Sequence, residues 1–207
     1  MWKEIEDRRK CSECPLKDKS YPLLFKTEMR VKIMAITEGP NEEAKPEFIA
    51  SLANHPTFTY LQAFFRGRFQ PMLSGSGTYW THLRKCFLKK GKCNFTSDNR
   101  KAIEECSSNY LKSEIEAANP RLIVAVGRKV AGFLLKEDKE LGGLSLKGLI
   151  LGGGIFRVKV CMSPIDVCVV PHPSGRSMFW VNLAKGRNSC DASRILTNIS
   201  SKIAKSL

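Results

Sequence analysis

The sequence predicts a three-layer α/β/α sandwich built on a central, mostly parallel sheet. Short, nearly continuous apolar runs occur at 31–37 and 121–127, and such runs are typical of parallel strands covered on both faces. Helical patterns separate these runs, and this alternation favours an open sheet with right-handed crossovers. The length of 207 residues suits one domain, so we expect residues 1–207 to form a single domain.

The predicted strands follow one another along the chain. The first is "VKIMAIT" at 31–37, and the later ones are "TYWTH" at 78–82, "RLIVAVG" at 121–127 and "VCVVP" at 167–171. The segment "LGGGIFRVKV" at 151–160 has three consecutive glycines but lacks the GxGxxG spacing of a phosphate-binding loop. We interpret it as a turn before a strand.

The clearest helix is predicted over 97–118. Ser97 can cap its start, and Pro120 enforces its end. Four apolar side chains share one face of this helix: Ile103, Cys106, Leu111 and Ile115.

Polar segments directly follow the predicted strands. In open α/β sheets, ligands bind beyond the carboxyl ends of the parallel strands. Three segments meet that criterion: "TEGPNEE" at 37–43, "THLRKC" at 81–86 and "PHPSGR" at 171–176. We expect them to converge on one site.

The charge of the chain favours a polyanionic partner. Lys and Arg number 34 against 20 Asp and Glu, a formal charge of +14, and cations gather at 84–101 and 176–207. A clustered basic surplus indicates nucleic acid. No stretch approaches the roughly 20 apolar residues of a membrane span, and the N-terminus is too charged for a secretory signal. We therefore expect a soluble, intracellular chain that does not bind membranes.

The cysteine spacing suggests a metal site. Cys11 and Cys14 form a CxxC pair, which lets two thiolates reach one metal ion or cluster edge. Cys86 and Cys106 are the best candidates to complete the site, and Cys93 competes with Cys86. Four thiolates suit either zinc or a 4Fe-4S cluster. The alternative is that Cys86 and Cys106 are ordinary core residues, since free cysteine is often buried.

These motifs together resemble those of the family-4 uracil-DNA glycosylases, within the uracil-DNA glycosylase superfamily. The resemblance rests on the CxxC, "TEGPN" after the first strand, "KC" after the second, a helical cysteine before "NPRLIVAVG", and the final "HPS". It spans about residues 11–177 and implies a four-stranded, mostly parallel sheet flanked by helices. It also implies a 4Fe-4S cluster, with zinc as the alternative, bound by Cys11, Cys14, Cys86 and Cys106.

The resemblance further implies an enzyme of DNA repair. Such an enzyme flips uracil out of DNA and hydrolyses its N-glycosidic bond, leaving an abasic site. We expect a monomer that binds damaged DNA. His172 takes the position of a histidine that hydrogen-bonds O2 of the departing pyrimidine, and Pro171 and Pro173 restrict the backbone that aims it. Glu38 takes the position of a glutamate that orients water or offsets charge on the sugar.

The remaining site residues implied by the resemblance bind the base or the DNA backbone. Gly39, Phe48 and His82 are the base-binding positions, with Phe48 as the stacking platform. The loop of Ser174, Gly175 and Arg176 would enter the minor groove and contact phosphates.

The sequence departs from the family motifs at three positions. Thr37 and Asn41 replace glycines, and His82 replaces an asparagine that reads the pyrimidine edge. An imidazole offers one donor and one acceptor in a different geometry. Two alternatives to uracil excision therefore stay open: a glycosylase for another modified base, and a non-catalytic metalloprotein that binds DNA.

Overall fold

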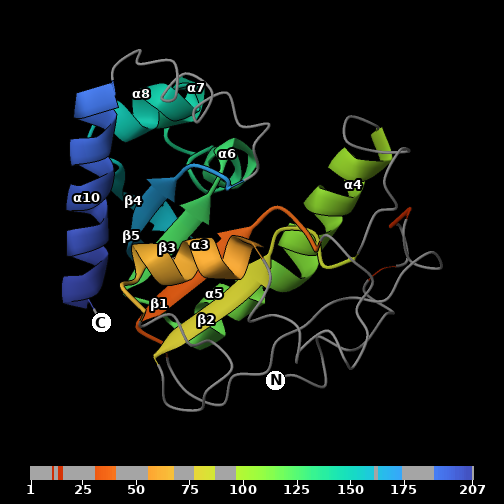
Figure 1. Cartoon of the computed structure of the whole chain (residues 1–207). Helices are drawn as coiled ribbons and strands as arrows, with labels where there is room; N and C mark the ends of the chain where they lie inside the picture. Colours follow the sequence, from red (N-terminus) through yellow and green to blue (C-terminus); the bar gives the residue numbers. More distant parts are fainter. Residues whose placement is uncertain are drawn as a thin grey trace.

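The computed structural model describes residues 11, 14–15, 31–40, 56–67, 77–86, 97–160, 163–173 and 189–206. Within these ranges the chain forms one five-stranded sheet in the order β2-β1-β3-β5-β4 (Figure 1). Its strands are β1 (Ile33–Thr37), β2 (Thr78–His82), β3 (Leu122–Val126), β4 (Ile155–Val160) and β5 (Ser163–Val170). All neighbouring pairs are parallel except β4 with β5, so the mostly parallel α/β prediction is confirmed.

The expected count of four strands is wrong, because β4 adds an antiparallel edge strand. Its register with β5 runs from Val160 opposite Ser163 to Ile155 opposite Cys168. Gly153 and Gly154 precede it with positive φ angles of 109° and 69°, so the turn predicted in this segment is present. Pairing with β4 also extends β5 four residues ahead of the predicted strand start. Its first two residues, Ser163 and Pro164, are exposed, so no apolar run reveals them.

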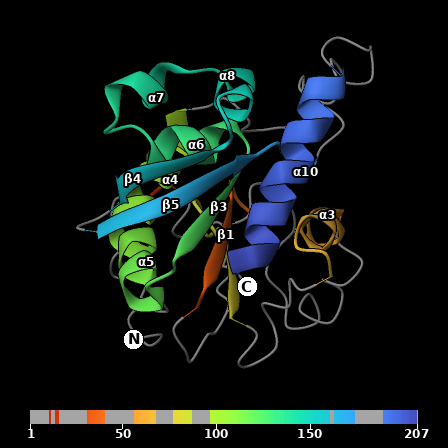
Figure 2. The ribbon, with the colours of Figure 1, turned by 90° about the vertical axis from the view of Figure 1, so that its left-hand side faces the viewer.

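Helices cover both faces of the sheet (Figure 2). One layer contains α3 (Pro56–Phe64) and α10 (Ser189–Ser206), which are joined by a hydrogen bond from Ser200 Oγ to the Phe64 carbonyl at 2.8 Å. The other layer contains α5 (Lys112–Ala118). Three short helices lie near the carboxyl end of β3: α6 (Arg128–Leu134), α7 (Lys139–Gly143) and α8 (Leu146–Leu151). No helix in the described ranges is long and apolar enough to cross a membrane.

The predicted helix 97–118 is present, but a π-helical turn interrupts it. It consists of α4 (Ser97–Cys106), the π turn (Ser107–Leu111) and α5. Eight residues of regular α-helix would separate Cys106 and Glu114 by about 80° around the axis. A π turn takes in one extra residue, which reduces that separation to about 20°. Both residues are therefore buried, each 2% exposed.

The helix ends where the sequence predicts. Asn119 adopts the left-handed conformation with φ of 44°, its backbone N–H donates to the Ile115 carbonyl at 2.8 Å, and Pro120 follows. Strands β1, β2 and β3 are buried along their whole length, which explains the nearly continuous apolar runs of β1 and β3.

Candidate active site and cysteine cluster

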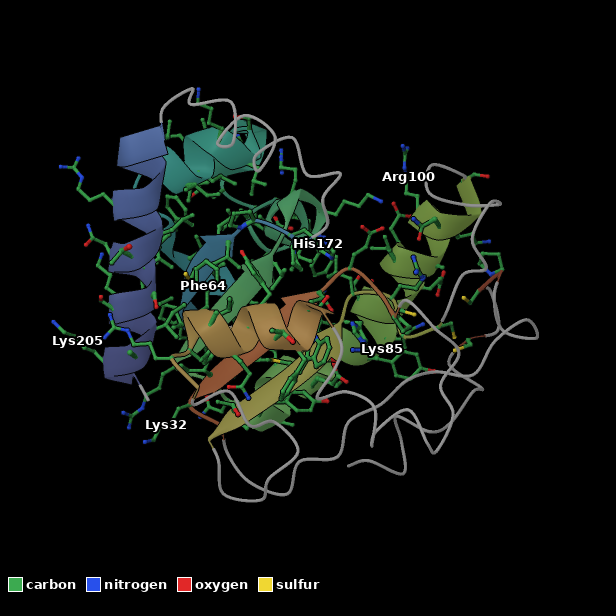
Figure 3. The ribbon with its side chains drawn as sticks, in the orientation of Figure 1. Lys32, Phe64, Lys85, Arg100, His172 and Lys205 are labelled. Carbon is green, nitrogen blue, oxygen red and sulfur yellow. The ribbon has the colours of Figure 1, made fainter. Side chains whose placement is uncertain are left out.

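Strands β2, β1, β3 and β5 run parallel, so their carboxyl ends share one edge of the sheet. Glu38 follows β1, and His82 ends β2 directly beside Thr37 in the register. His172 lies two residues beyond β5. The segments predicted to flank a common site therefore begin at a common edge. His172 and Lys85 mark this side of the molecule in Figure 3.

The Glu38 carboxylate is held by side chains from two helices. Its Oε1 accepts a hydrogen bond from Lys129 Nζ at 2.6 Å and one from Asn99 Nδ2 at 3.4 Å. The Lys129 and Glu38 side chains are 42% and 33% exposed, so this ion pair contributes less than about 1 kcal/mol to stability. Its effect is to orient the carboxylate at the surface. Neither Lys129 nor Asn99 belongs to a motif, and sequence reasoning missed both.

A buried arginine connects Glu38 to the cysteine region. Arg84 Nη1 donates to Asn99 Oδ1 at 2.5 Å, and its Nε donates to the Cys86 carbonyl at 2.8 Å. The guanidinium also covers Gly39, where a Cβ atom would lie 2.6 Å from Nη2. Gly39 therefore has a packing reason to be glycine, whatever its part in base binding. A series of hydrogen-bonded side chains therefore runs from the surface to the cysteines, in the order Lys129, Glu38, Asn99 and Arg84.

His82 and Thr37, which depart from the family motif separately in the sequence, contact each other. Thr37 Oγ1 lies 2.5 Å from His82 Nδ1, and it accepts a hydrogen bond from Trp80 Nε1 at 3.1 Å. The Trp80 and His82 rings meet edge to face at 5.6 Å. Thr37 and His82 are each 3% exposed. The two substitutions therefore act as one buried unit at the end of β1 and β2.

The backbone around His172 is fixed from two sides. Tyr60 on α3 donates from its hydroxyl to the Pro171 carbonyl at 2.7 Å. Burial, and secondarily Cys168, raise the pKa of Tyr60 far above its usual value, so the phenol remains a donor. On the other side, a Cβ at Gly127 would lie 3.3 Å from His172 Cβ, and the φ of Gly127 is 91°. Glycine suits this position for both reasons.

Four of the predicted site residues lie outside the described residues: Phe48, Ser174, Gly175 and Arg176. The competing cysteine, Cys93, also lies outside them. Of the aromatic residues in the same sequence region, Phe64 and Phe65 are 8% and 0% exposed and belong to the core.

The four predicted cysteines come together from three separate segments. Cys14 packs with Cys86, Cys106 packs with Tyr110, and Cys11 contacts both groups. The Cys14 backbone N–H donates to the Cys11 carbonyl at 2.9 Å, which closes the CxxC turn. All four thiols are free of disulfides. Among the described residues, no three His, Cys, Asp or Glu side chains form a group that could hold a metal ion as they stand.

Residues of the π-helical segment and the "KC" motif surround these thiols. The Tyr110 hydroxyl, within the π turn, lies 3.0 Å from Cys11 Sγ. Burial raises the pKa of the Cys106 thiol to about 11, while a backbone hydrogen bond with Lys85 and its positive charge oppose that rise. An all-thiol donor set with a buried cation beside it suits zinc or an iron-sulfur cluster, both of which bind thiolates.

Lys85 itself belongs to a fully buried ion pair. Its Nζ lies 2.5 Å from Glu114 Oε2, and both side chains are 1% exposed. Lys85 also donates to Thr81 Oγ1 at 2.6 Å and to the His82 carbonyl at 2.7 Å. Glu114 accepts from Thr81 Oγ1 at 2.9 Å and from the Tyr79 hydroxyl at 3.2 Å. Sequence reasoning did not find Glu114.

Strand β2 therefore carries different chemistry on its two faces. Tyr79 and Thr81 face Glu114 on α5, whereas Trp80 packs toward Phe58 on α3, with ring centroids 6.5 Å apart. Alternation of side chains along a strand produces this division. The Lys85–Glu114 ion pair lies on the α5 side of β2. The contact between Thr37 and His82 lies at the carboxyl ends of β1 and β2.

The protein is thus an α/β/α sandwich whose candidate site residues lie at the carboxyl ends of its parallel strands. The family model described as the uracil DNA glycosylase superfamily matches residues 26–194. The chain belongs to the uracil DNA glycosylase superfamily, a family of DNA repair glycosylases. No curated protein sequence matches the chain. The matched segment begins after Cys11 and Cys14, so it does not extend to the CxxC pair.

Proposed function

We propose that the chain excises uracil from DNA through hydrolysis of the N-glycosidic bond. One observation carries the proposal within this superfamily: Glu38 and His172 follow two parallel strands, β1 and β5, that flank a third, β3, which Gly127 follows directly. Two strand spacings separate β1 from β5 by about 10 Å. This spacing would let a nucleoside lie between the carboxylate and the imidazole, and Gly127 lets the His172 backbone pass close to the end of β3.

The proposed reaction uses these two groups on opposite ends of the breaking bond. The bond between C1′ and the base nitrogen breaks, and the base departs with the electron pair. His172 donates a hydrogen bond to O2 of the base, where negative charge develops. Glu38 orients the water whose oxygen bonds to C1′, and the released water proton passes to the departing base.

Lys129 and Asn99 would act as positioning residues for this carboxylate. Their two hydrogen bonds to Oε1 leave Oε2 of Glu38 to face a water molecule. The exposed ion pair is weak, so Lys129 orients the carboxylate without cancelling its attraction to the cationic sugar.

We also propose a 4Fe-4S cluster held by Cys11, Cys14, Cys86 and Cys106, with zinc as the alternative. The convergence of these free thiols from three segments supports it. When bound, the group supplies a structural cross-link among the N-terminal segment, the end of β2 and α4. Lys85 would offset part of the thiolate charge. Protein purified without oxygen should be yellow-brown and absorb near about 400 nm. Colourless protein with stoichiometric zinc would favour the alternative.

An excision assay tests the activity. Purified protein is incubated with end-labelled duplexes that carry one uracil, hypoxanthine or hydroxymethyluracil, and alkali then cleaves any abasic site. We expect scission at uracil and a loss of about 100-fold in the single-turnover rate for Glu38→Gln. Glu140→Gln, at an exposed position on α7, is the matched control and should keep the parental rate. No scission on any duplex would contradict the proposal and favour a DNA-binding role.

A second candidate function is excision of a different modified base. The contact between Thr37 and His82 favours it, because the two residues that depart from the family motifs touch each other and so change one part of the site together. An imidazole held at Nδ1 by Thr37 presents at most one further polar atom, whereas an amide side chain presents a donor and an acceptor. Faster scission at hypoxanthine or hydroxymethyluracil than at uracil would establish this second function.

A further inference from the structure

The opposite edge of the sheet carries a hollow that the proposed reaction does not use. It has a volume of about 750 Å³ and is lined by Val31, Lys32, Asn119, Pro120, Arg121, Leu122, Arg157, Pro164, Asp166 and Lys205. Lys32 and Arg121 directly precede β1 and β3, whereas Glu38 and His172 follow strands. Strands of five residues place the two edges roughly 17 Å apart. Figure 3 shows Lys32 and Lys205 on this side, away from His172.

The register of the sheet sets the position of the charged residues in this hollow. Ile33 pairs with Leu122, Leu122 with Asp166, and Asp166 with Arg157, so the lining follows one row across four strands. Arg121 sits one residue before that row, and its backbone N–H donates to the Lys32 carbonyl at 3.0 Å. Lys205, in the last turn of α10, completes the wall. Sites built on strands hold their groups more rigidly than sites built on loops.

The charges of the lining favour an anion. Four lining residues are cationic and one, Asp166, is anionic, a surplus of three positive charges. Asp166 accepts from Arg157 Nη1 at 2.9 Å, which fixes the guanidinium at the rim of the hollow. Arg121 and Lys205 are exposed and lie on different elements of the wall. Guanidinium groups match phosphate oxygens through paired N–H donors.

The lining also narrows the class of anion. None of the ten lining residues is aromatic, so this hollow offers no surface on which a nucleobase could stack. Its exposed rim is polar, which disfavours an apolar ligand. The volume falls in the range of small-molecule sites, about 300–1,000 Å³. DNA bound at the carboxyl ends of the parallel strands would lie at the opposite edge of the sheet from this hollow.

We propose that this hollow binds a small oligophosphate anion, with Arg121, Arg157 and Lys205 as the phosphate contacts. The charge surplus of three matches an anion with two or three linked phosphates. This site is independent of the excision chemistry at the other edge.

Calorimetric titration with sodium tripolyphosphate tests the proposal at about 50 mM salt, where screening is moderate. The pocket variant is Arg121→Gln with Lys205→Gln. The matched control is Lys139→Gln with Lys147→Gln, which removes two exposed charges from α7 and α8. We expect the pocket variant to weaken tripolyphosphate binding at least about tenfold and the control to weaken it less than about twofold. Equal weakening in both variants, or no binding to the parent, overturns the proposal.

A second arm separates a free oligophosphate from the DNA backbone as the source of phosphate. Affinity for an undamaged duplex is measured for the same two variants. We expect equal, small losses in both, because duplex DNA does not occupy the hollow. A loss confined to the pocket variant of about tenfold or more would make this edge part of the DNA interface and overturn the proposal. Both variants change only exposed side chains, and their unfolding midpoints should match that of the parent.

Discussion

Replacing Glu114 by Gln should destabilise the protein far more than a similar change at the surface. Gln keeps the size of the side chain, and its single amide oxygen can still accept the hydrogen bond of either Tyr79 or Thr81, which donate to different oxygens of Glu114. It removes the negative charge that lies 2.5 Å from Lys85 Nζ, at a site where both side chains are 1% exposed. A buried cation without its counter-charge costs about 3–5 kcal/mol.

The control for this change is Asp166→Asn. It breaks a pair of similar length, 2.9 Å, whose side chains are 61% and 44% exposed. Water screens such a pair, so the expected loss is below about 1 kcal/mol. The contrast between the two variants isolates burial, because the chemical change from carboxylate to amide is the same.

Equilibrium unfolding in urea provides the measurement. With a denaturant slope of about 2–3 kcal/mol per molar, a loss of 4 kcal/mol moves the midpoint down by roughly 1.3–2 M. Adding Lys85→Met to Glu114→Gln removes the stranded charge, so the double variant should recover part of the loss. If Glu114→Gln shifts the midpoint no further than Asp166→Asn, burial does not make the loss of the Lys85–Glu114 ion pair more costly in unfolding free energy.

Four further outcomes are expected. His172→Ala should lower the single-turnover excision rate about 100-fold and leave affinity for undamaged DNA unchanged, since its hydrogen bond strengthens only as the base gains charge; full activity would refute this role. Gly127→Ala should cost about 1–3 kcal/mol in thermal or urea unfolding, because φ is 91° and the new Cβ would lie 3.3 Å from His172 Cβ. Unchanged stability would contradict that account. Cys106→Ala should lose bound iron while Cys93→Ala keeps it, and equal iron loss would show that the ligand set is misassigned. DNA affinity should fall with salt at a log-log slope of roughly −4 to −5 for about five neutralised phosphates, and a flat response would exclude DNA as the partner.

The sequence by itself determined the parallel part of the sheet. Strands β1, β2 and β3 are buried on both faces, and in β1 and β3 this burial leaves a nearly continuous apolar run that can be recognised locally. The carboxyl-edge positions of Glu38, His82 and His172 followed, because parallel strands present their carboxyl ends at one edge. The CxxC spacing likewise indicated that Cys11 and Cys14 lie together. Cys86 and Cys106 were the best candidates to join them, with Cys93 competing with Cys86, and the first four do converge.

Tertiary structure decided the fifth strand and the shape of the long helix. The exposed start of β5 becomes strand only because β4 pairs with it, so no local pattern marks it. The π turn cannot be read from helical periodicity, because it shifts that periodicity by one residue to bury Cys106 and Glu114 on the same side.

The polar contacts of the site were also decided by tertiary structure. The partners in each contact are far apart in the chain: Glu38 with Lys129, Lys85 with Glu114, Cys11 with Tyr110, and Thr37 with His82. Periodicity and capping describe interactions within a few residues, whereas strand order and register determine which distant side chains meet. A polar or charged residue can therefore be placed on an element from the sequence, but its partner is selected only when the elements pack.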